Sequence, residues 1–373
     1  MTKPDARHLL ARIRTLVVKL GTQLLTEKGT GRLDAAFLGQ LAKQVASLRE
    51  RGVQVTIVSS GAVGAGVAEL GLAKRPTDLA KLQATAAVGQ RRLMDAWADA
   101  FDGHGLKVAQ LLLTREDIDD RTRFLNVRNT IHAVQELGAV PIINENDTIS
   151  TDELIQISFG DNDILAGLVA NALRADVLVL LSVVDGLLDD AGNPVRLVDS
   201  LDQAASLVRK EKSPLGKGGM NSKLEAAKMM TQSGEALVVA DGRMDNVLTR
   251  IVAGEPVGTL FASAAKGKRS SRSRWIGSAR PAGTITVDDG AVRALLANKS
   301  LLPIGIVKTA GEFDPGDVVD VVSADGKLVA RGLSNYASAD VLRVQGKKTA
   351  EVRSLLAEAA YDEVVHRDNL VLC

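Results

Sequence analysis

The chain has 373 residues, of which 46% are hydrophobic and 24% charged. At roughly 150 residues per domain this length predicts two or three domains, and the composition excludes a disordered, collagen-like or fibrous chain. The 46 basic and 45 acidic residues give a net charge of +1, which argues against electrostatic attraction of the whole protein to nucleic acid or membranes. The single cysteine, Cys373, excludes an internal disulfide and a cysteine-based zinc site, and it fits a reducing compartment.

The N-terminal sequence MTKPDARHLLARIR lacks the apolar stretch and the cleavage site of a signal peptide. The longest apolar run, residues 177–184, is interrupted by Ser182 and is much shorter than the roughly 20 residues that cross a bilayer. We therefore expect a cytoplasmic protein that does not enter a membrane.

The first 260 residues alternate short apolar runs with longer stretches of helical periodicity. Nearly continuous apolar strands alternating with helices predict an α/β fold, with an open and mostly parallel sheet sandwiched by helices. In such sheets ligands bind outside the carboxyl ends of the strands. The expected strands are 13–18, 53–58, 107–113, 139–143, 176–181 and 236–240, and the expected helices are 34–50, 78–101, 124–137, 162–173, 199–210 and 221–233.

The pattern changes after about residue 260. Residues 266–280 contain six basic residues and no acid, which we interpret as a linker. The remaining chain predicts a small, mostly β domain with one helix near 290–298 and short strands at 283–287, 303–307, 317–322 and 328–333. The predicted domains are therefore 1–265 and 281–373, joined by the linker.

Two glycine-containing turns follow the first two expected strands. The sequence VVKLGT places Lys19 beside Gly21, and an ammonium group near exposed backbone N–H groups suits phosphate. The sequence SSGAVGAG over residues 59–66 carries three glycines, but it matches neither the dinucleotide fingerprint nor the phosphate loop of nucleotide triphosphatases. The alternatives are a surface lysine next to a turn and a tight turn packed on a neighbour.

An acidic segment occupies residues 144–163, with six acids and no Lys or Arg. Such a segment could hold a cation, an amino group or a catalytic lysine, or it could be a solvated loop. It lacks the spacing of a calcium-binding loop. Residues 160–163 precede an apolar helix, so one of them could simply cap that helix.

A fourth segment, GKGGMNSK over residues 216–223, precedes a helix and suggests a second anion site, with a linker as the alternative. Lys223 lies in the first helical turn, where the helix dipole disfavours a cation unless a polyphosphate is near.

None of the four histidines falls in the four segments, which argues against a Ser-His-Asp or Cys-His hydrolase. A nucleophile that is already ionised, such as a carboxylate with a pKa of about 4.3, is favoured.

Taken together, the motifs resemble the glutamate 5-kinases of the amino acid kinase family. They occur in the family's order over nearly the whole chain and read VVKLGT, VSSGAVGAG, AAVGQRRLM, LLLTRED, RFLNVRNT, PIINENDT, GDND, GKGGMNSK, PAGTITVDDGA and VHRD. The C-terminal part resembles a PUA domain. Relatives in the family phosphorylate acetylglutamate, aspartate, carbamate or UMP, and the PUA-like tail and the NEND sequence at residues 144–147 favour glutamate among these substrates.

The resemblance implies an amino acid kinase domain at 1–265 that transfers a phosphoryl group from ATP to the γ-carboxylate of L-glutamate. This reaction would be the first step of proline biosynthesis, with Mg²⁺ as cofactor and with proline as a feedback inhibitor. The implied catalytic residues are Lys19, Lys223, Asp163, Gly21 and Gly61. The implied glutamate-binding residues are Ser60, Asp147, Asn162 and Asn144.

For ATP the resemblance implies contacts from three parts of the chain, while Mg²⁺ would be held mostly by the phosphates rather than by protein side chains. The implied ATP-binding residues are Lys19, Ser182, Val183, Asp185, Gly216, Lys217, Gly218, Gly219, Met220, Asn221, Ser222 and Lys223. Asp117 and Glu153 are the candidate regulatory residues. The expected partners are a second copy of the chain, as a homodimer or homotetramer, and the next enzyme of the pathway.

The sequence departs from the family's pattern after the strand that leads to the adenosine. Val183 replaces an acid and Leu188 replaces an aromatic residue, although Ser182 and Asp185 remain. Lys217 stands where the family commonly has Thr. Polar contacts to adenosine are therefore expected to be fewer, and one more charge is expected near the phosphates.

Two other functions compete with this interpretation. The PUA-like tail and the basic linker suggest an RNA-binding protein, but the net charge of +1 and an aromatic content of 3% disfavour RNA as a partner. A catalytically inactive kinase-like sensor would bind glutamate without releasing ADP.

Overall fold

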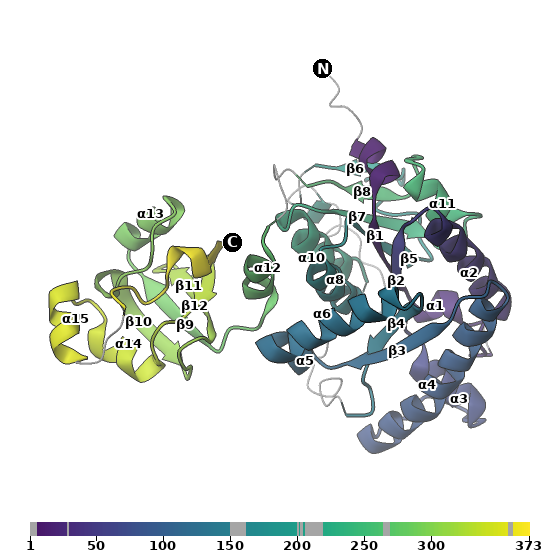
Figure 1. Cartoon of the computed structure of the whole chain (residues 1–373), viewed down its shortest axis with the longest axis horizontal. Coiled ribbons are helices and arrows are strands. Elements are labelled where there is room, and N and C mark those ends of the chain that lie inside the picture. Colours follow the sequence, from purple (N-terminus) through teal and green to yellow (C-terminus); the bar gives the residue numbers. More distant parts are fainter. Residues whose placement is uncertain are drawn as a thin grey trace. The chain divides into compact units, whose positions relative to one another are not determined.

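A computed structural model of the chain describes residues 6–27, 30–149, 162–199, 201, 204–205, 219–263, 269–356 and 361–373. The chain divides into two compact units, Met1–Lys268 and Arg269–Cys373. Each unit is described by itself below. Figure 1 shows the elements of both units.

The first unit is built on an eight-stranded sheet with the order β3-β4-β2-β1-β5-β7-β8-β6. Only β7 and β8 pair antiparallel, and the other neighbours in this sheet are parallel. The expected open, mostly parallel sheet is confirmed, although β6 and β8 were not expected. The strands are β1 (Thr15–Leu20), β2 (Gln54–Val58), β3 (Val108–Leu113), β4 (Val140–Glu145), β5 (Val177–Ser182), β6 (Leu197–Val198), β7 (Ala236–Asp241) and β8 (Thr259–Phe261).

Helices cover both faces of this sheet. Alternate residues of β1, including Leu16, Val18 and Leu20, join the core formed with α2, α4 and α11, while α8 and α10 lie against the opposite face (Figure 1). Because side chains alternate along a strand, Lys19 faces α8 and α10. The helices are η1 (Ala6–Arg12), α1 (Thr22–Leu25), α2 (Ala35–Glu50), α3 (Ala62–Glu69), α4 (Leu79–Asp102), α5 (Arg115–Asp119), α6 (Arg121–Glu136), α8 (Asn162–Leu173), α10 (Gly219–Gln232) and α11 (Val247–Val252). The helix expected at 199–210 lies mostly outside the described residues.

The α3 and α4 helices touch at the backbone. A Cβ atom on Gly89 would lie 1.8 Å from the carbonyl oxygen of Ala62, and one on Gly66 would lie 1.9 Å from that of Thr85. No larger residue fits at either position, since these contacts are to backbone atoms. The third glycine of SSGAVGAG therefore serves packing, and the contact fixes α3, whose first turn follows Gly61.

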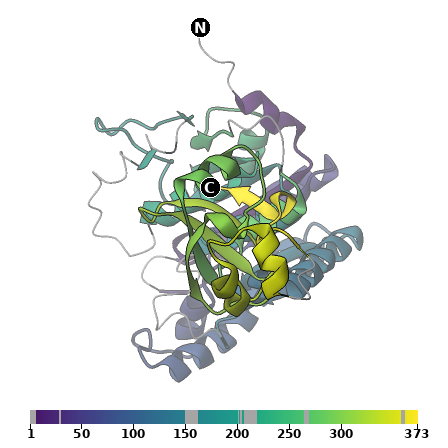
Figure 2. The same ribbon diagram turned by 90° about the vertical axis from the view of Figure 1, so that its left-hand side faces the viewer.

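The second unit has a five-stranded sheet with the order β10-β9-β11-β12-β13, and its core includes Ile285, Val319 and Val321. The expected β-rich domain is confirmed, but it contains more helices than the one expected (Figure 2). Residues 303–305 form a short helix where a strand was expected, because Pro303 lacks a backbone N–H and suits a first helical turn. The elements are α12 (Ser271–Ser278), β9 (Gly283–Val287), α13 (Asp289–Leu296), η2 (Pro303–Gly305), β10 (Ile306–Gly311), β11 (Val318–Ser323), β12 (Leu328–Leu333), α14 (Ser338–Val344), α15 (Thr349–Leu355), η3 (Arg367–Asn369) and β13 (Leu370–Leu372).

The basic segment expected as a linker at 266–280 is helical over Ser271–Ser278. Trp275 and Ile276 are buried, and the helix packs on β12 and β13 of its own unit. The Arg274 side chain is also buried and donates to the carbonyl oxygen of Arg269 at 2.8 Å. The segment differs from a solvated tether because one apolar pair anchors it, despite its many charges. The predicted domain limits of 265 and 281 stay a prediction.

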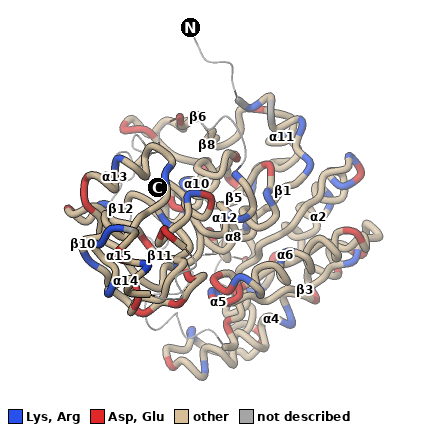
Figure 3. Tube along the Cα trace, turned by 60° about the vertical axis from the view of Figure 1, so that its left-hand side comes forward, with Lys and Arg blue, Asp and Glu red and all other residues tan. Residues whose placement is uncertain are grey.

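Charges of both signs are interleaved along the elements of each unit (Figure 3). Within the described parts of the chain, no helix is both long enough and apolar enough to cross a membrane.

Candidate active site

The carboxyl ends of four neighbouring strands meet at one edge of the first sheet. Lys19 of β1 pairs with Val58 of β2, and Val58 pairs with Ile143 of β4. Leu20 pairs with Leu181 of β5. The residues that follow these positions therefore converge at the edge where parallel sheets bind ligands.

Two lysines share one aspartate at this edge. Lys19 Nζ lies 2.7 Å from Asp163 Oδ1, and Lys223 Nζ lies 2.9 Å from Asp163 Oδ2. Ser222 Oγ also donates to Asp163 Oδ2, at 3.0 Å. Lys19, Lys223 and Asp163 are only 4%, 8% and 0% exposed. The structure thus brings together three of the predicted catalytic residues from β1, α8 and α10.

The charge of this cluster suits an anion. Burial alone would raise the pKa of Asp163, but the two ammonium groups and their hydrogen bonds outweigh it and hold that pKa below its usual value. The two ammonium groups place positive charge in a nearly dry site. Such a charge attracts phosphate far more strongly than it would in water.

The lowered pKa of Asp163 predicts a loss of stability in acid. Since the folded-state pKa lies below the unfolded one, of about 3.9, the ionised carboxylate stabilises the fold above that pH, and this contribution disappears as pH falls through the folded-state value. We expect the difference in unfolding free energy between the natural protein and Asp163→Asn to shrink below about pH 4. Urea denaturation from pH 7 to pH 3 measures it, and a difference that is constant over this range would contradict the prediction.

A second group of side chains connects the ends of β2 and β4 to α8. Asn162 Nδ2 lies 2.7 Å from the carbonyl oxygen of Ser59, 2.8 Å from Ser60 Oγ and 3.0 Å from Asn144 Oδ1. Asn144 Nδ2 in turn donates to Gln90 Oε1 at 2.8 Å. The structure therefore assembles Ser60, Asn144 and Asn162 beside the lysine cluster. Gln90 was not singled out from the sequence, and its only signal was its place in AAVGQRRLM.

The two turn glycines differ in what they require. Gly61 has φ +99° and precedes the first turn of α3, a left-handed conformation that favours glycine. Gly21 has φ −78° and precedes α1, so its backbone is ordinary. A Cβ atom there would lie 3.9 Å from Lys19 Nζ, and its absence leaves room for a ligand beside that ammonium group.

The residues after β4 and β5 are less enclosed. Asp147 is half-buried in the turn that follows β4, and Ser182 is half-buried at the end of β5. Val183 is 44% exposed, and Leu188 is 36% exposed. Asp185 accepts from Arg196 Nη1 at 2.8 Å, so one of its oxygens is already engaged.

Several predicted residues lie outside the described residues, namely Gly216, Lys217, Gly218 and Glu153. The first turn of α10 is described and contains Gly219, Met220, Asn221 and Ser222.

The regulatory candidate Asp117 lies at the start of α5. It accepts from the backbone and hydroxyl of Thr114 and pairs with Arg123 at 3.0 Å. Its carboxylate therefore already has three structural contacts.

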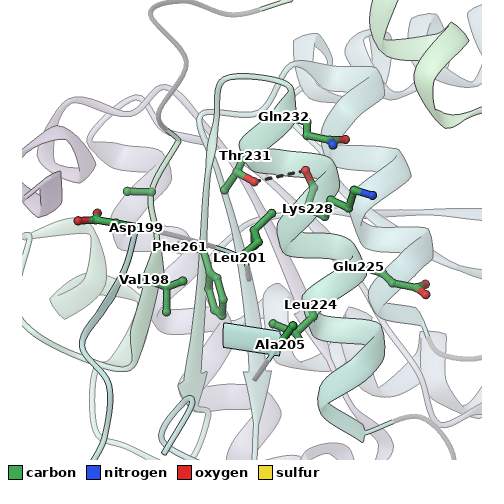
Figure 4. A pocket seen from close by; sticks show the side chains of 11 residues that line it. Val198, Asp199, Leu201, Ala205, Leu224, Glu225, Lys228, Thr231, Gln232 and Phe261 are labelled. Carbon is green, nitrogen blue, oxygen red and sulfur yellow. Dashed lines mark hydrogen bonds between the residues drawn. The ribbon is translucent and has the colours of Figure 1, made fainter. Parts of the chain in front are cut away.

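A hollow of about 540 Å³ lies beside α10 (Figure 4). Leu224 and Lys228 of α10 line one side of it, and Val198 and Phe261 of β6 and β8 line another. Its lining includes none of Lys19, Asp163, Lys223, Ser60, Gln90, Asn144 and Asn162. The strand-end residues, rather than this hollow, carry the chemistry of the site.

The described residues fit a nucleotide better than a bare metal ion. They include no group of three His, Cys, Asp or Glu side chains placed to hold a metal, and both oxygens of Asp163 face lysines. A magnesium ion held by phosphate oxygens is compatible with such a site.

A mostly parallel α/β sheet with two buried lysines at its carboxyl edge fits an α/β enzyme that transfers phosphoryl groups, because ligands bind at this edge and lysines stabilise the transferring charge. The chain matches the amino acid kinase family over residues 14–241 and the PUA domain over residues 283–356. It is 45% identical to the glutamate 5-kinase of Pseudomonas putida strain F1, over 95% of this chain and 97% of that protein. It is 44% identical to the glutamate 5-kinase of Caldanaerobacter subterraneus subsp. tengcongensis, over 96% and 97% of the two chains.

Among solved structures, carbamate kinase from Giardia lamblia bound to AMP-PNP has the same fold, with a TM-score of 0.50 and 18% identity over 68% of this chain and 99% of that one. The chain belongs to the amino acid kinase family, with a PUA domain joined to its kinase domain. The resemblance to glutamate 5-kinases found in the sequence is confirmed by the full-length relatives.

Proposed function

We propose that the protein phosphorylates the γ-carboxylate of L-glutamate with ATP and releases γ-glutamyl phosphate and ADP. The observation that carries this proposal is the Lys19–Asp163–Lys223 cluster at the carboxyl edge of the sheet. Curated relatives that match nearly the full chain carry the name glutamate 5-kinase, which supports glutamate as the acceptor.

Catalysis in this proposal is positioning and electrostatics. Lys19 and Lys223 neutralise the charge of the phosphoryl group in flight, and Asp163 holds both ammonium groups in place. The N–H groups of Gly21 and Gly61 donate to the same group. The attacking carboxylate is already ionised at neutral pH, so the reaction requires no general base.

Binding divides into an amino-acid side and a nucleotide side. Ser60, Asn144, Asp147 and Asn162 hold glutamate, with the Asp147 carboxylate paired to the α-ammonium group. Ser182, Asp185 and the first turn of α10 hold ATP, together with residues 216–218. Mg²⁺, held by oxygens of ATP, supplies further charge neutralisation.

The proposal is tested by ADP release with glutamate, compared with aspartate, N-acetylglutamate and UMP. Glutamate should be strongly preferred. Binding of glutamate without ADP release would instead identify the inactive sensor, and a preference for another acceptor would place the protein in a different branch of the family.

The pathway and assembly are further parts of this proposal. The product is an acyl phosphate, which hydrolyses readily, so transfer to the next enzyme of proline biosynthesis is an advantage. We propose a cytoplasmic homodimer or homotetramer. Sedimentation velocity of the full chain, with and without glutamate and ATP, tests the assembly.

Restoring the acid at position 183 should strengthen ATP binding. Val183 is exposed after β5, and a carboxylate there can accept a hydrogen bond from the nucleotide. We expect Val183→Asp to lower the KM for ATP. The gain in binding free energy should not exceed that of one charge-assisted hydrogen bond, about 1.5–3 kcal/mol. Val184→Asp is the matched control, because Val184 is 42% exposed compared with 44% for Val183. Equal effects of the two variants would contradict a specific contact.

Proline should compete with glutamate and not with ATP. It shares the α-carboxylate and a cationic amine of glutamate but lacks the γ-carboxylate, so the residues that hold the α-groups can hold either ligand. We expect the half-inhibitory proline concentration to rise with glutamate, and Glu153→Ala to relieve inhibition with little loss of turnover. Glu312→Ala, in the second unit, is the control. A half-inhibitory concentration independent of glutamate would point to a separate allosteric site.

A further inference from the structure

A chain of three amide side chains runs from α4 to the amino-acid side of the site. Gln90 Oε1 accepts from Asn144 Nδ2 at 2.8 Å, and Asn144 Oδ1 accepts from Asn162 Nδ2 at 3.0 Å. Gln90 and Asn144 are only 7% and 3% exposed. These hydrogen bonds thus link the buried Gln90 of α4 to Asn162, in the first turn of α8.

A backbone carbonyl fixes the donor-to-acceptor direction of these side-chain hydrogen bonds. The Ser59 carbonyl can only accept, and it lies 2.7 Å from Asn162, so the amide nitrogen of Asn162 must face it. Asn144 must then present its oxygen to Asn162 and its nitrogen to Gln90. An inverted Asn144 would set its N–H donors against those of Asn162 and its oxygen against Gln90 Oε1.

The orientation of Asn162 decides what it can recognise. Its nitrogen is directed at three acceptors on the ends of β2 and β4. Its oxygen accepts no hydrogen bond from any residue that the structure describes, and Asn162 is half-buried rather than enclosed. The atom left for a ligand is therefore an acceptor, which fits an ammonium group and not a carboxylate.

Of the two polar atoms of the Gln90 side chain, only the oxygen makes a hydrogen bond with a residue that the structure describes. Its Nε2 is buried and has no hydrogen-bond partner in the described parts of the chain. Leucine or methionine would fill similar space without burying an unsatisfied donor. Its neighbour Gly89 is in backbone contact with α3, so this turn of α4 is rigidly placed relative to Gly61.

We propose that Gln90 is a positioning residue: through Asn144 it holds the Asn162 oxygen toward the substrate, where it accepts from the α-ammonium group. Gln90 itself touches no reacting atom. This inference rests on the proposed function, because it requires Asn162 to contact the amino acid.

The test is steady-state kinetics of Gln90→Leu, with Gln90→Glu as the conservative variant that keeps an acceptor for Asn144. We expect Gln90→Leu to raise the KM for glutamate about tenfold, the upper range for one net hydrogen bond, and to leave the KM for ATP within about twofold. Gln90→Glu should stay within about threefold of the natural protein for glutamate. The matched control is Gln135→Leu, because Gln135 is likewise buried but donates to Thr56 Oγ1, at 3.0 Å, rather than to Asn144 or Asn162.

Gln90→Asn keeps the experiment informative if Gln90→Leu does not fold. It is shorter by one methylene, so it loses the contact to Asn144 with less disturbance, and the glutamate KM should still rise. An unchanged glutamate KM in the folded variants would overturn the proposal, as would equal rises in Gln90→Leu and Gln135→Leu or a loss confined to kcat. If the natural protein does not phosphorylate glutamate, the proposed function itself fails, and that result is distinct from a silent Gln90 variant.

Discussion

Replacing Asp163 with Asn should reduce kcat by about 100- to 1000-fold, the scale of losing one preorganised charged contact in a dry site. The carboxylate is fully buried and its two oxygens lie 2.7 Å and 2.9 Å from Lys19 and Lys223. Without it, two buried ammonium groups repel each other and lose the geometry that the transferring phosphoryl group needs. Breaking a buried ion pair on one side also costs about 3–5 kcal/mol of stability.

Turnover and unfolding must be measured together for Asp163→Asn, because both should fall. Asp320→Asn is the control, since Asp320 pairs with Arg331 at 2.7 Å with both side chains mostly covered, but it belongs to the second unit. Addition of ATP should recover part of the lost stability, because phosphate supplies the missing negative charge. A folded Asp163→Asn protein that keeps more than about a fifth of the natural turnover would refute the assigned role.

The architecture of the kinase domain could be predicted from the sequence because its signals are local. Each central strand is a short apolar run between turn residues, and the long helices have clear periodicity. The six expected strands of the first unit are all present, with ends shifted by no more than two residues. The turns after β1 and β2 could be placed at the ligand-binding edge for the same reason, since parallel strands share their carboxyl edge.

The assembly of the site could not be predicted from spacing. Lys223 in a first helical turn opposes the helix dipole, and the sequence alone offered an unseen polyphosphate as compensation. The structure shows a nearer compensating charge, because Asp163 Oδ2 lies 2.9 Å from Lys223 Nζ. That contact depends on how α8 and α10 pack together, which no local pattern records. The acidic composition of residues 144–163 allowed for a lysine partner, but only the family resemblance grouped Asp163 with Lys223 as catalytic residues.

The features that were missed depend on tertiary contacts. Residues 271–278 carry mostly polar and basic side chains. Trp275 and Ile276 are buried and the helix packs on β12 and β13, and this tertiary packing is what makes the segment part of the second unit. Gln90 was missed for a related reason. Glutamine is usually a surface residue, and nothing nearby in the sequence reveals its partner Asn144.

Replacing Lys19 with Ala should lower kcat by about 100- to 1000-fold while the KM for glutamate changes little. Lys19 is 4% exposed on the β1 strand, and it faces the same site as Gly21. Its ammonium group meets the phosphoryl group most closely during transfer, when the charge is spread over three oxygens. The α-groups of glutamate are held elsewhere, by Asn162 and Asp147 in our proposal, so ground-state binding should survive. Initial rates at varied glutamate and ATP separate the two effects.

Two further substitutions extend this test. Lys19→Met distinguishes the charge of Lys19 from its packing, and Lys223→Ala distinguishes the role of Lys223 from that of Lys19. Lys19→Met keeps most of the buried stem and removes only the charge, so it should lose as much turnover as Lys19→Ala with a smaller loss of stability. Lys223→Ala should lose similar turnover but also raise the KM for ATP, because Lys223 lies on the helix of the nucleotide side. Asp163 keeps one partner in each single variant, so these proteins should fold better than Asp163→Asn. A folded Lys19→Met protein that loses less than about fivefold in kcat would show that Lys19 serves the fold and not the transfer.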